Sequence, residues 1–183
     1  MSDAFDPARL QSDIVALLTR VRSVSLASVH ADGMPLASYA PFALMEGDAG
    51  FWVLLSELAA HARNLREHPD CSVLALADEA GSAQIYVRER CQYEMQAARV
   101  DRGTSDWRLG CDRLRARHGA LVDTLEQLAD FQLFRLRPVS GRYVVGFGRA
   151  YALEPGTLTL VAAHLQGPTG PIRDDLSAPD VQT

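Results

Sequence analysis

The chain has 183 residues, of which 48% are hydrophobic and 22% charged, and its formal net charge at pH 7 is −5. These values exclude a disordered or collagen-like chain and predict one globular domain, residues 1–183. The acidic balance argues against nucleic acid as a partner, because proteins that bind its phosphate backbone are normally basic. No apolar run approaches the ~20 residues of a membrane span, and the N-terminus does not resemble a signal peptide, so we expect a cytoplasmic protein without membrane contact.

The first predicted element is a helix within about residues 1–20. Asp6 can cap this helix and Pro7 suits its first turn. Its apolar residues recur at helical spacing: Leu10, Ile14, Leu17 and Leu18. Runs of small, apolar and β-branched residues then predict five strands, over about 22–30, 34–44, 51–55, 71–77 and 84–97. The third strand, 51–55, is apolar throughout, which indicates burial on both faces.

The remaining segments predict helices and a further pair of strands. Helices are expected over about 58–69, after Thr104, from about Leu121 to Leu128, and over 157–165. Residues 132–137 and 142–148 are predicted to form a hairpin across 138–141. The Gly- and Pro-rich tail, 167–183, is expected to be flexible. Short strands joined mostly by tight turns favour an α+β, mainly β fold, an antiparallel barrel with peripheral helices.

The familiar catalytic motifs are missing from this sequence. It has no G-x-S-x-G, no Walker loop, no H-E-x-x-H, and no G-x-G-x-x-G after a strand. The three cysteines, Cys71, Cys91 and Cys111, match neither a disulfide framework nor a zinc site, and we interpret them as buried thiols. No catalytic or metal-binding residue is therefore assigned from motifs.

Two segments around the third strand have the chemistry to hold a ligand. In 35–42, Ser38 and Ala40 share one face of a strand and Tyr39 lies on the other, which suits either a flat ligand or an ordinary barrel strand. In 56–65, a buried strand leads into a helix whose first turn has free amide donors, a natural anion site. There His61 and Asn64 are one turn apart, either as ligand contacts or as a solvated helix face.

Two later segments carry weaker signals. Arg88 and Arg90 are predicted on one face of the fifth strand, where two guanidinium groups repel each other unless an anion or an acidic partner lies between them. The alternative is an ion-pair ladder on the surface. Gly146-Phe147-Gly148 is too short for a dinucleotide fingerprint, so we interpret these glycines as a strand bend or a close backbone approach.

Five segments, in this order, resemble the pyridoxamine-5′-phosphate-oxidase-like FMN-binding split barrels, and most closely their haem-utilisation branch of the HugZ/HutZ type. They are ADGMP (31–35), SYAPF (38–42), LAAHARNL (58–65), DFQLFRL (130–136) and GFGRAY (146–151). The resemblance extends to about Leu165. It implies a split β-barrel, a homodimer with two cofactor sites shared between the subunits, and a flavin-dependent oxidoreductase that uses FMN on a small-molecule substrate.

On that resemblance, the FMN phosphate is bound near the start of the helix after the third strand and by the arginine pair, and the flavin ring lies against 38–41. The implied cofactor contacts are Ser38, Tyr39, Ala40, Pro41, Leu55, Ser56, His61, Arg63, Asn64, Arg88, Arg90, Phe147 and Gly148.

The sequence departs from the family at two positions. The flavin oxidases have an Arg-Lys pair for the phosphate where this chain has Ala60 and His61. The haem branch has a C-terminal H-L-x-x-G-H pattern whose last histidine ligates iron, but Thr169 stands at that position here. Asp130, which in that branch supports the ligand from the other subunit, is retained, and His164 is nearby. The alternatives to a flavin enzyme are therefore a haem-degrading protein, with Asp130 and His164 at its iron site, or a non-catalytic carrier of flavin or haem.

Overall fold

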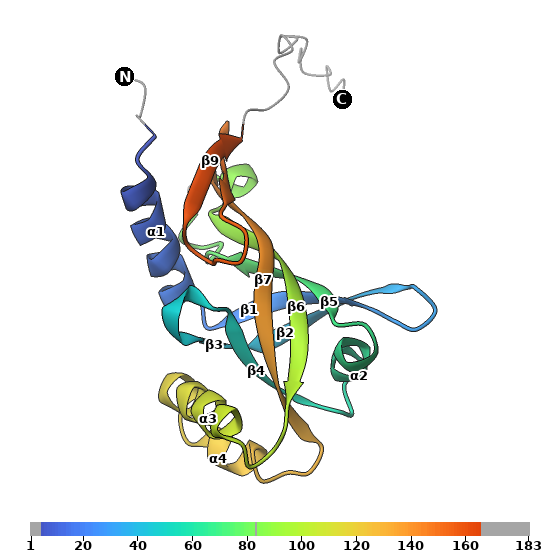
Figure 1. The fold of residues 1–183 in the computed structure, drawn as a ribbon. Coiled ribbons are helices and arrows are strands. Elements are labelled where there is room, and N and C mark those ends of the chain that lie inside the picture. Colours follow the sequence, from blue (N-terminus) through green and yellow to red (C-terminus); the bar gives the residue numbers. More distant parts are fainter. Residues whose placement is uncertain (1–4, 83, 166–183) are drawn as a thin grey trace, which may run out of the picture.

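The computed structural model describes residues 5–82 and 84–165. In this part of the chain, nine antiparallel strands form one sheet of order β2-β1-β5-β6-β7-β4-β3, and β8 and β9 extend it from β7 (Figure 1). The strands are β1 (Ser23–Val29), β2 (Pro35–Pro41), β3 (Ala43–Leu44), β4 (Phe51–Ser56), β5 (Asp70–Leu76), β6 (Arg90–Val100), β7 (Phe131–Gly146), β8 (Arg149–Leu153) and β9 (Val161–Leu165). The sheet curls until β2 lies beside β4 without joining it in the strand order. The predicted split barrel is confirmed.

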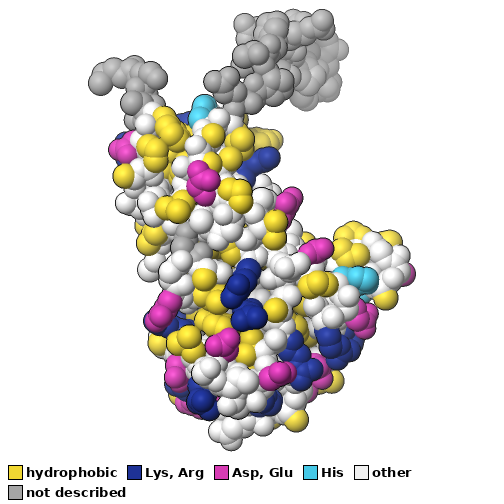
Figure 2. Space-filling view, in the orientation of Figure 1, with side chains coloured by type: hydrophobic (Ala, Val, Ile, Leu, Met, Phe, Trp, Pro, Cys, Tyr) yellow, Lys and Arg dark blue, Asp and Glu magenta, His cyan; other side chains and the backbone are white. Residues whose placement is uncertain are grey.

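Four α-helices and two 3₁₀ turns surround the described sheet. They are α1 (Pro7–Arg20), η1 (Glu46–Asp48), α2 (Ala60–Glu67), η2 (Ile85–Val87), α3 (Ser105–His118) and α4 (Leu121–Leu125). Figure 1 places α3 and α4 together at one end of the molecule and β9 at the other. Figure 2 shows that the end with β9 is narrow and the end with the helices is broad. None of the described helices has the length and apolarity to cross a membrane.

Helix α1 follows its sequence pattern closely. The Asp6 side chain accepts hydrogen bonds from the amides of Ala8 and Arg9, and Pro7 is the first helical residue. The predicted apolar residues are all buried against the barrel: Leu10, Ile14, Leu17 and Leu18. The expected amphipathic helix is therefore confirmed.

Strand β4 is buried on both faces, as its sequence predicts, and it separates two cores. Phe51, Val53 and Leu55 point into the barrel, where most of the other strands contribute. Trp52 and Leu54 point outward into a second core, which α3 and α4 cover. The second core fixes these two helices against the outer face of the barrel.

The predicted hairpin across 138–141 is wrong, because β7 runs through it without a break. Strand β6 pairs along its whole length with β7, and the register shifts by one residue between Ser140 and Pro138. Val139 is the extra residue of this bulge and is exposed. A bulge accommodates a proline, which has no amide hydrogen to donate to the ladder.

Two other boundaries also differ from the prediction. The helix predicted over 157–165 is wrong: Val161–Leu165 is strand β9, which pairs with β8. The predicted strand 34–44 is interrupted at Phe42, which is fully buried in the barrel core. The predicted flexible tail lies outside the described residues.

Candidate functional site

Strand β2, the end of β4 and the helix α2 that follows carry most of the predicted ligand contacts. On β2, Tyr39 is 64% exposed, and Pro41 is exposed on the same outer face. Ser38 and Ala40 point the other way, as predicted: Ser38 Oγ donates to the Leu26 carbonyl at 2.9 Å, and Ala40 is fully buried. A ligand outside the barrel therefore meets Tyr39 and Pro41.

On β4, Leu55 is buried inside the barrel, and the next residue, Ser56, is paired with a carboxylate. Ser56 Oγ donates to Asp130 Oδ2 at 2.6 Å. The Glu57 amide donates to the Asp130 carbonyl at 2.8 Å, and this bond fixes the backbone of Asp130. Asp130 thus places a negative charge where β4 ends and the chain turns toward α2.

Arg102 holds the loop that carries Asp130. Its guanidinium donates to the carbonyls of Glu126, Leu128 and Phe131, the last at 2.6 Å. The same guanidinium lies 4.4 Å from the centre of the Trp107 ring on α3. Sequence reasoning missed this positioning residue, because nothing local to Arg102 indicates contacts with carbonyls more than twenty residues away.

The first turn of α2 lacks a free cation for an anion. His61 is half-buried, and this burial lowers its pKa, so the imidazole is neutral near pH 7. The guanidinium of Arg63 turns back onto the preceding loop, where Nη1 donates to the carbonyls of Glu57 at 2.9 Å and Leu58 at 3.0 Å.

The sequence offered a shared solvated helix face as one interpretation of His61 and Asn64. The structure does not place Asn64 on such a face. It is 5% exposed, and its Nδ2 donates to Ser28 Oγ on β1 at 3.0 Å. Leu58, where the helix was predicted to begin, is 82% exposed because α2 begins only at Ala60. Asn64 therefore anchors α2 to the barrel and is closed to a ligand outside it.

Arg88 and Arg90 are not a pair on one strand face. Residues 85–87 form η2, so Arg88 precedes the strand, which begins at Arg90. Arg88 Nε donates to the Ala77 carbonyl at 2.6 Å, and its Nη1 is 3.3 Å from Glu79 Oε2. Arg90 Nη1 donates to the Arg88 carbonyl at 2.9 Å. Both guanidinium groups already have acceptors within the protein.

Phe147, Gly148 and His164 lie at the opposite end of the sheet. Phe147 is 75% exposed, in the β7–β8 turn that the positive φ of Gly148 permits. His164, predicted on a helix, is on β9 and donates through Nε2 to the Gly148 carbonyl at 2.6 Å. Tyr151 lies beneath it, with ring centres 5.1 Å apart.

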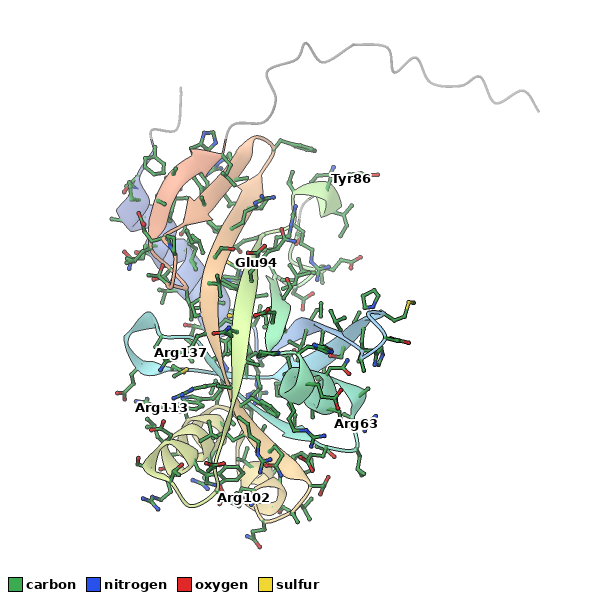
Figure 3. All side chains as sticks on the ribbon, turned by 45° about the vertical axis from the view of Figure 1, so that its right-hand side comes forward. Arg63, Tyr86, Glu94, Arg102, Arg113 and Arg137 are labelled. Atoms are coloured by element: carbon green, nitrogen blue, oxygen red, sulfur yellow. The ribbon has the colours of Figure 1, made fainter. Side chains whose placement is uncertain are left out.

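The predicted contacts thus form two groups at opposite ends of the folded molecule. Asp130 is next to the start of β7, whereas His164 pairs through Tyr151 with Tyr143, far along β7. At about 3.3 Å per residue, this stretch of β7 spans on the order of 40 Å. Figure 3 shows Arg63 on α2 and Tyr86 on η2, two residues before Arg88, well apart along the molecule. A single copy of the chain does not bring the two groups together.

An apolar cleft adjoins the β2–β4 face, and sequence reasoning did not find it. The cleft, of about 240 Å³, is lined by Arg22, Pro41, Leu54, Leu114, His118, Leu121, Val122 and Leu125. His118 Nε2 donates to the Phe42 carbonyl at 2.8 Å, and burial lowers the pKa of His118. A signal was present, since His118 continues the helical spacing of Trp107, Cys111 and Leu114. We call this the α3–α4 cleft.

Comparison with known proteins identifies the family. The family described as Pyridoxamine 5'-phosphate oxidase matches residues 10–145, more than two thirds of the chain. The chain belongs to this family. It is also 38% identical over 146 residues to the protein named Heme oxygenase HutZ of Vibrio cholerae, covering 80% of this chain and 82% of that protein.

Solved structures agree with the sequence match. The crystal structure of HutZ, there described as the heme storage protein of Vibrio cholerae, is 34% identical with a TM-score of 0.71 over 75% of this chain and 97% of that one. Campylobacter jejuni ChuZ is 27% identical with a TM-score of 0.80, over 92% and 68% of the two chains. The resemblance to the haem-utilisation branch is confirmed.

Proposed function

We propose that this protein binds haem, rather than FMN, on the outer face of β2 and β4, and that it acts in haem utilisation. The names given to HutZ, a haem oxygenase and a haem storage protein, support this assignment. We further propose that two subunits share the site, because residues of both predicted groups can meet only if one group comes from a second chain.

The Ser56–Asp130 pair is the observation that carries the proposal. It places a carboxylate beside the first turn of α2, where the flavin oxidases bind the FMN phosphate. At an effective dielectric constant near 20, two unit charges about 4 Å apart repel each other by about 4 kcal/mol. His61 and Arg63 offset this repulsion only in part, because burial disfavours the charged form of His61 and Arg63 Nη1 is turned back onto the carbonyls of Glu57 and Leu58. The residues present do not fit a dianionic phosphate.

The same face fits a macrocycle. Ligand sites for large flat molecules are mostly apolar, with a few placed polar groups. The α3–α4 cleft provides the apolar wall through Pro41, Leu54 and Leu121, and Tyr39 continues it along β2. These side chains would exclude water from one face of the ring, and Asp130 would keep one carboxylate oxygen as an acceptor for a group from the other subunit. Haem, once bound, supplies redox-active iron.

Titration of the purified protein with haem and with FMN tests this proposal. We expect a shifted Soret band that saturates with haem, and weak binding of FMN. Asp130→Asn keeps the shape of the side chain and removes its charge, so FMN affinity should rise about tenfold or more. Asp70→Asn, at an exposed position on β5, is the matched control and should change neither affinity.

Two results would contradict the proposal. The first is tight FMN binding by the wild-type protein that haem does not displace. The second is an FMN affinity that Asp130→Asn leaves unchanged, which would show that the Asp130 carboxylate is not what weakens FMN binding. Adding a reductant in air to the haem-loaded protein then separates degradation, in which the Soret band is lost, from storage, in which it persists.

A further inference from the structure

A basic cluster at the mouth of the α3–α4 cleft has no acidic partner among the described residues. It consists of Arg22, which precedes β1, and His118 of α3, which both line the cleft, and of the adjoining Arg117, whose carbonyl accepts from Arg22. Arg22 Nη2 donates to the Arg117 carbonyl at 3.3 Å. Arg117 Nη2 donates to the Leu18 carbonyl at 2.7 Å, and its guanidinium lies 4.6 Å from the centre of the Phe42 ring. Every partner is neutral, so the two guanidinium groups keep their positive charge, whereas burial lowers the pKa of His118.

The other arginines considered for the site are already engaged elsewhere in the protein. Arg88 is paired with Glu79, and Arg63 is folded onto two carbonyls. Arg22 is exposed, lines the cleft, and uses one of its five N–H donors in a long hydrogen bond. It is therefore the arginine at this cleft with a guanidinium fork open to a carboxylate.

The cleft thus combines an apolar wall with a positive rim. Leu54, Leu121 and Leu125 form the wall, and Arg22 stands at the rim beside His118. Such a site selects an apolar molecule that carries a carboxylate at one edge, because each part of the ligand meets its complement. Its volume of about 240 Å³ holds one edge of a large ring rather than a whole macrocycle.

We propose that Arg22 binds a propionate of the tetrapyrrole, with the adjoining pyrrole edge seated among the leucines of the α3–α4 cleft. This inference rests on the proposed function and adds the residue that orients the ring. Arg117 has a positioning role: its carbonyl accepts from Arg22, and its own guanidinium ties the end of α3 to the end of α1.

Metal-free protoporphyrin IX and its dimethyl ester test this inference without involving iron. Porphyrin fluorescence and quenching of the protein's tryptophans report binding directly. We expect the wild-type protein to bind the diacid about tenfold or more tightly than the diester, because esterification removes the charge that Arg22 recognises. Arg22→Gln should abolish this preference while leaving ester affinity nearly unchanged, and Arg22→Lys should retain part of it.

The control is Arg20→Gln, near in sequence but paired with Glu89 away from the cleft. It should keep the full preference for the diacid. If Arg22→Gln and the wild-type protein discriminate equally, the inference is overturned while the haem proposal stands. If neither porphyrin binds the wild-type protein, and haem does not bind either, the proposed function itself fails. Far-UV circular dichroism of each variant establishes that the fold is intact.

Discussion

Replacing Gly110 by alanine tests how closely α3 packs on the outer face of β4. A Cβ at this position would lie 2.6 Å from Cδ2 of Leu133 and 3.0 Å from Cε3 of Trp52. Both neighbours are buried, so neither can move aside into solvent. Alanine favours a helix over glycine by about 1 kcal/mol, whereas overpacking a core costs about 1–3 kcal/mol. Because 2.6 Å is too short for a carbon contact, we expect overpacking to prevail and the free energy of unfolding to fall by about 1–2 kcal/mol.

Urea unfolding monitored by tryptophan fluorescence measures this effect, since Trp52 and Trp107 both lie in the second core. Leu133→Val, which removes the clashing methyl group, should destabilise the wild-type protein more than it destabilises the Gly110→Ala variant. A displaced α3 should also weaken porphyrin binding in the α3–α4 cleft. A Gly110→Ala protein more stable than wild type by about 1 kcal/mol would show that helix propensity decides, and would refute the close packing.

Four further outcomes are expected. Burial lowers the pKa values of His61 and His118, so at and below the ordinary histidine pKa of about 6.5 the unfolded chain binds more protons than the folded protein. Urea unfolding should therefore show that the free energy of unfolding decreases as the pH is lowered below that value. Asn64→Ala should cost about 1–3 kcal/mol in the same assay, because Ser28 loses its buried partner. His61→Lys should raise FMN affinity in titrations by placing a cation in the first turn of α2. Sedimentation should show a dimer at micromolar concentration; a stable monomer would contradict the shared site.

Local sequence patterns predicted the elements whose residues determine them. Asp6 and Pro7 specify the start of α1, and the unbroken apolar run of β4 led to its burial on both faces. The bulge at Val139 was not predictable in this way, because it depends on the register between β6 and β7. Without that partner, Pro138 and Gly141 indicate a turn.

The candidate site was predicted only in part, for a similar reason. The family resemblance drew attention to Ser56 and Asp130, and the structure joins them by a hydrogen bond across seventy-four positions. The same resemblance suggested Asn64 as a ligand contact, but its partner on β1 turns it inward. The α3–α4 cleft combines two helices and the ends of two strands, so no single segment of the sequence indicates it.

An equilibrium competition between haem and FMN decides which of the two cofactors this protein selects. The wild-type protein is dialysed against an equimolar mixture of the two cofactors, and the absorption spectrum of the protein compartment is recorded. We expect an intense Soret band and no flavin bands above the free FMN background. Paired flavin bands in the blue, with no Soret band retained, would contradict it.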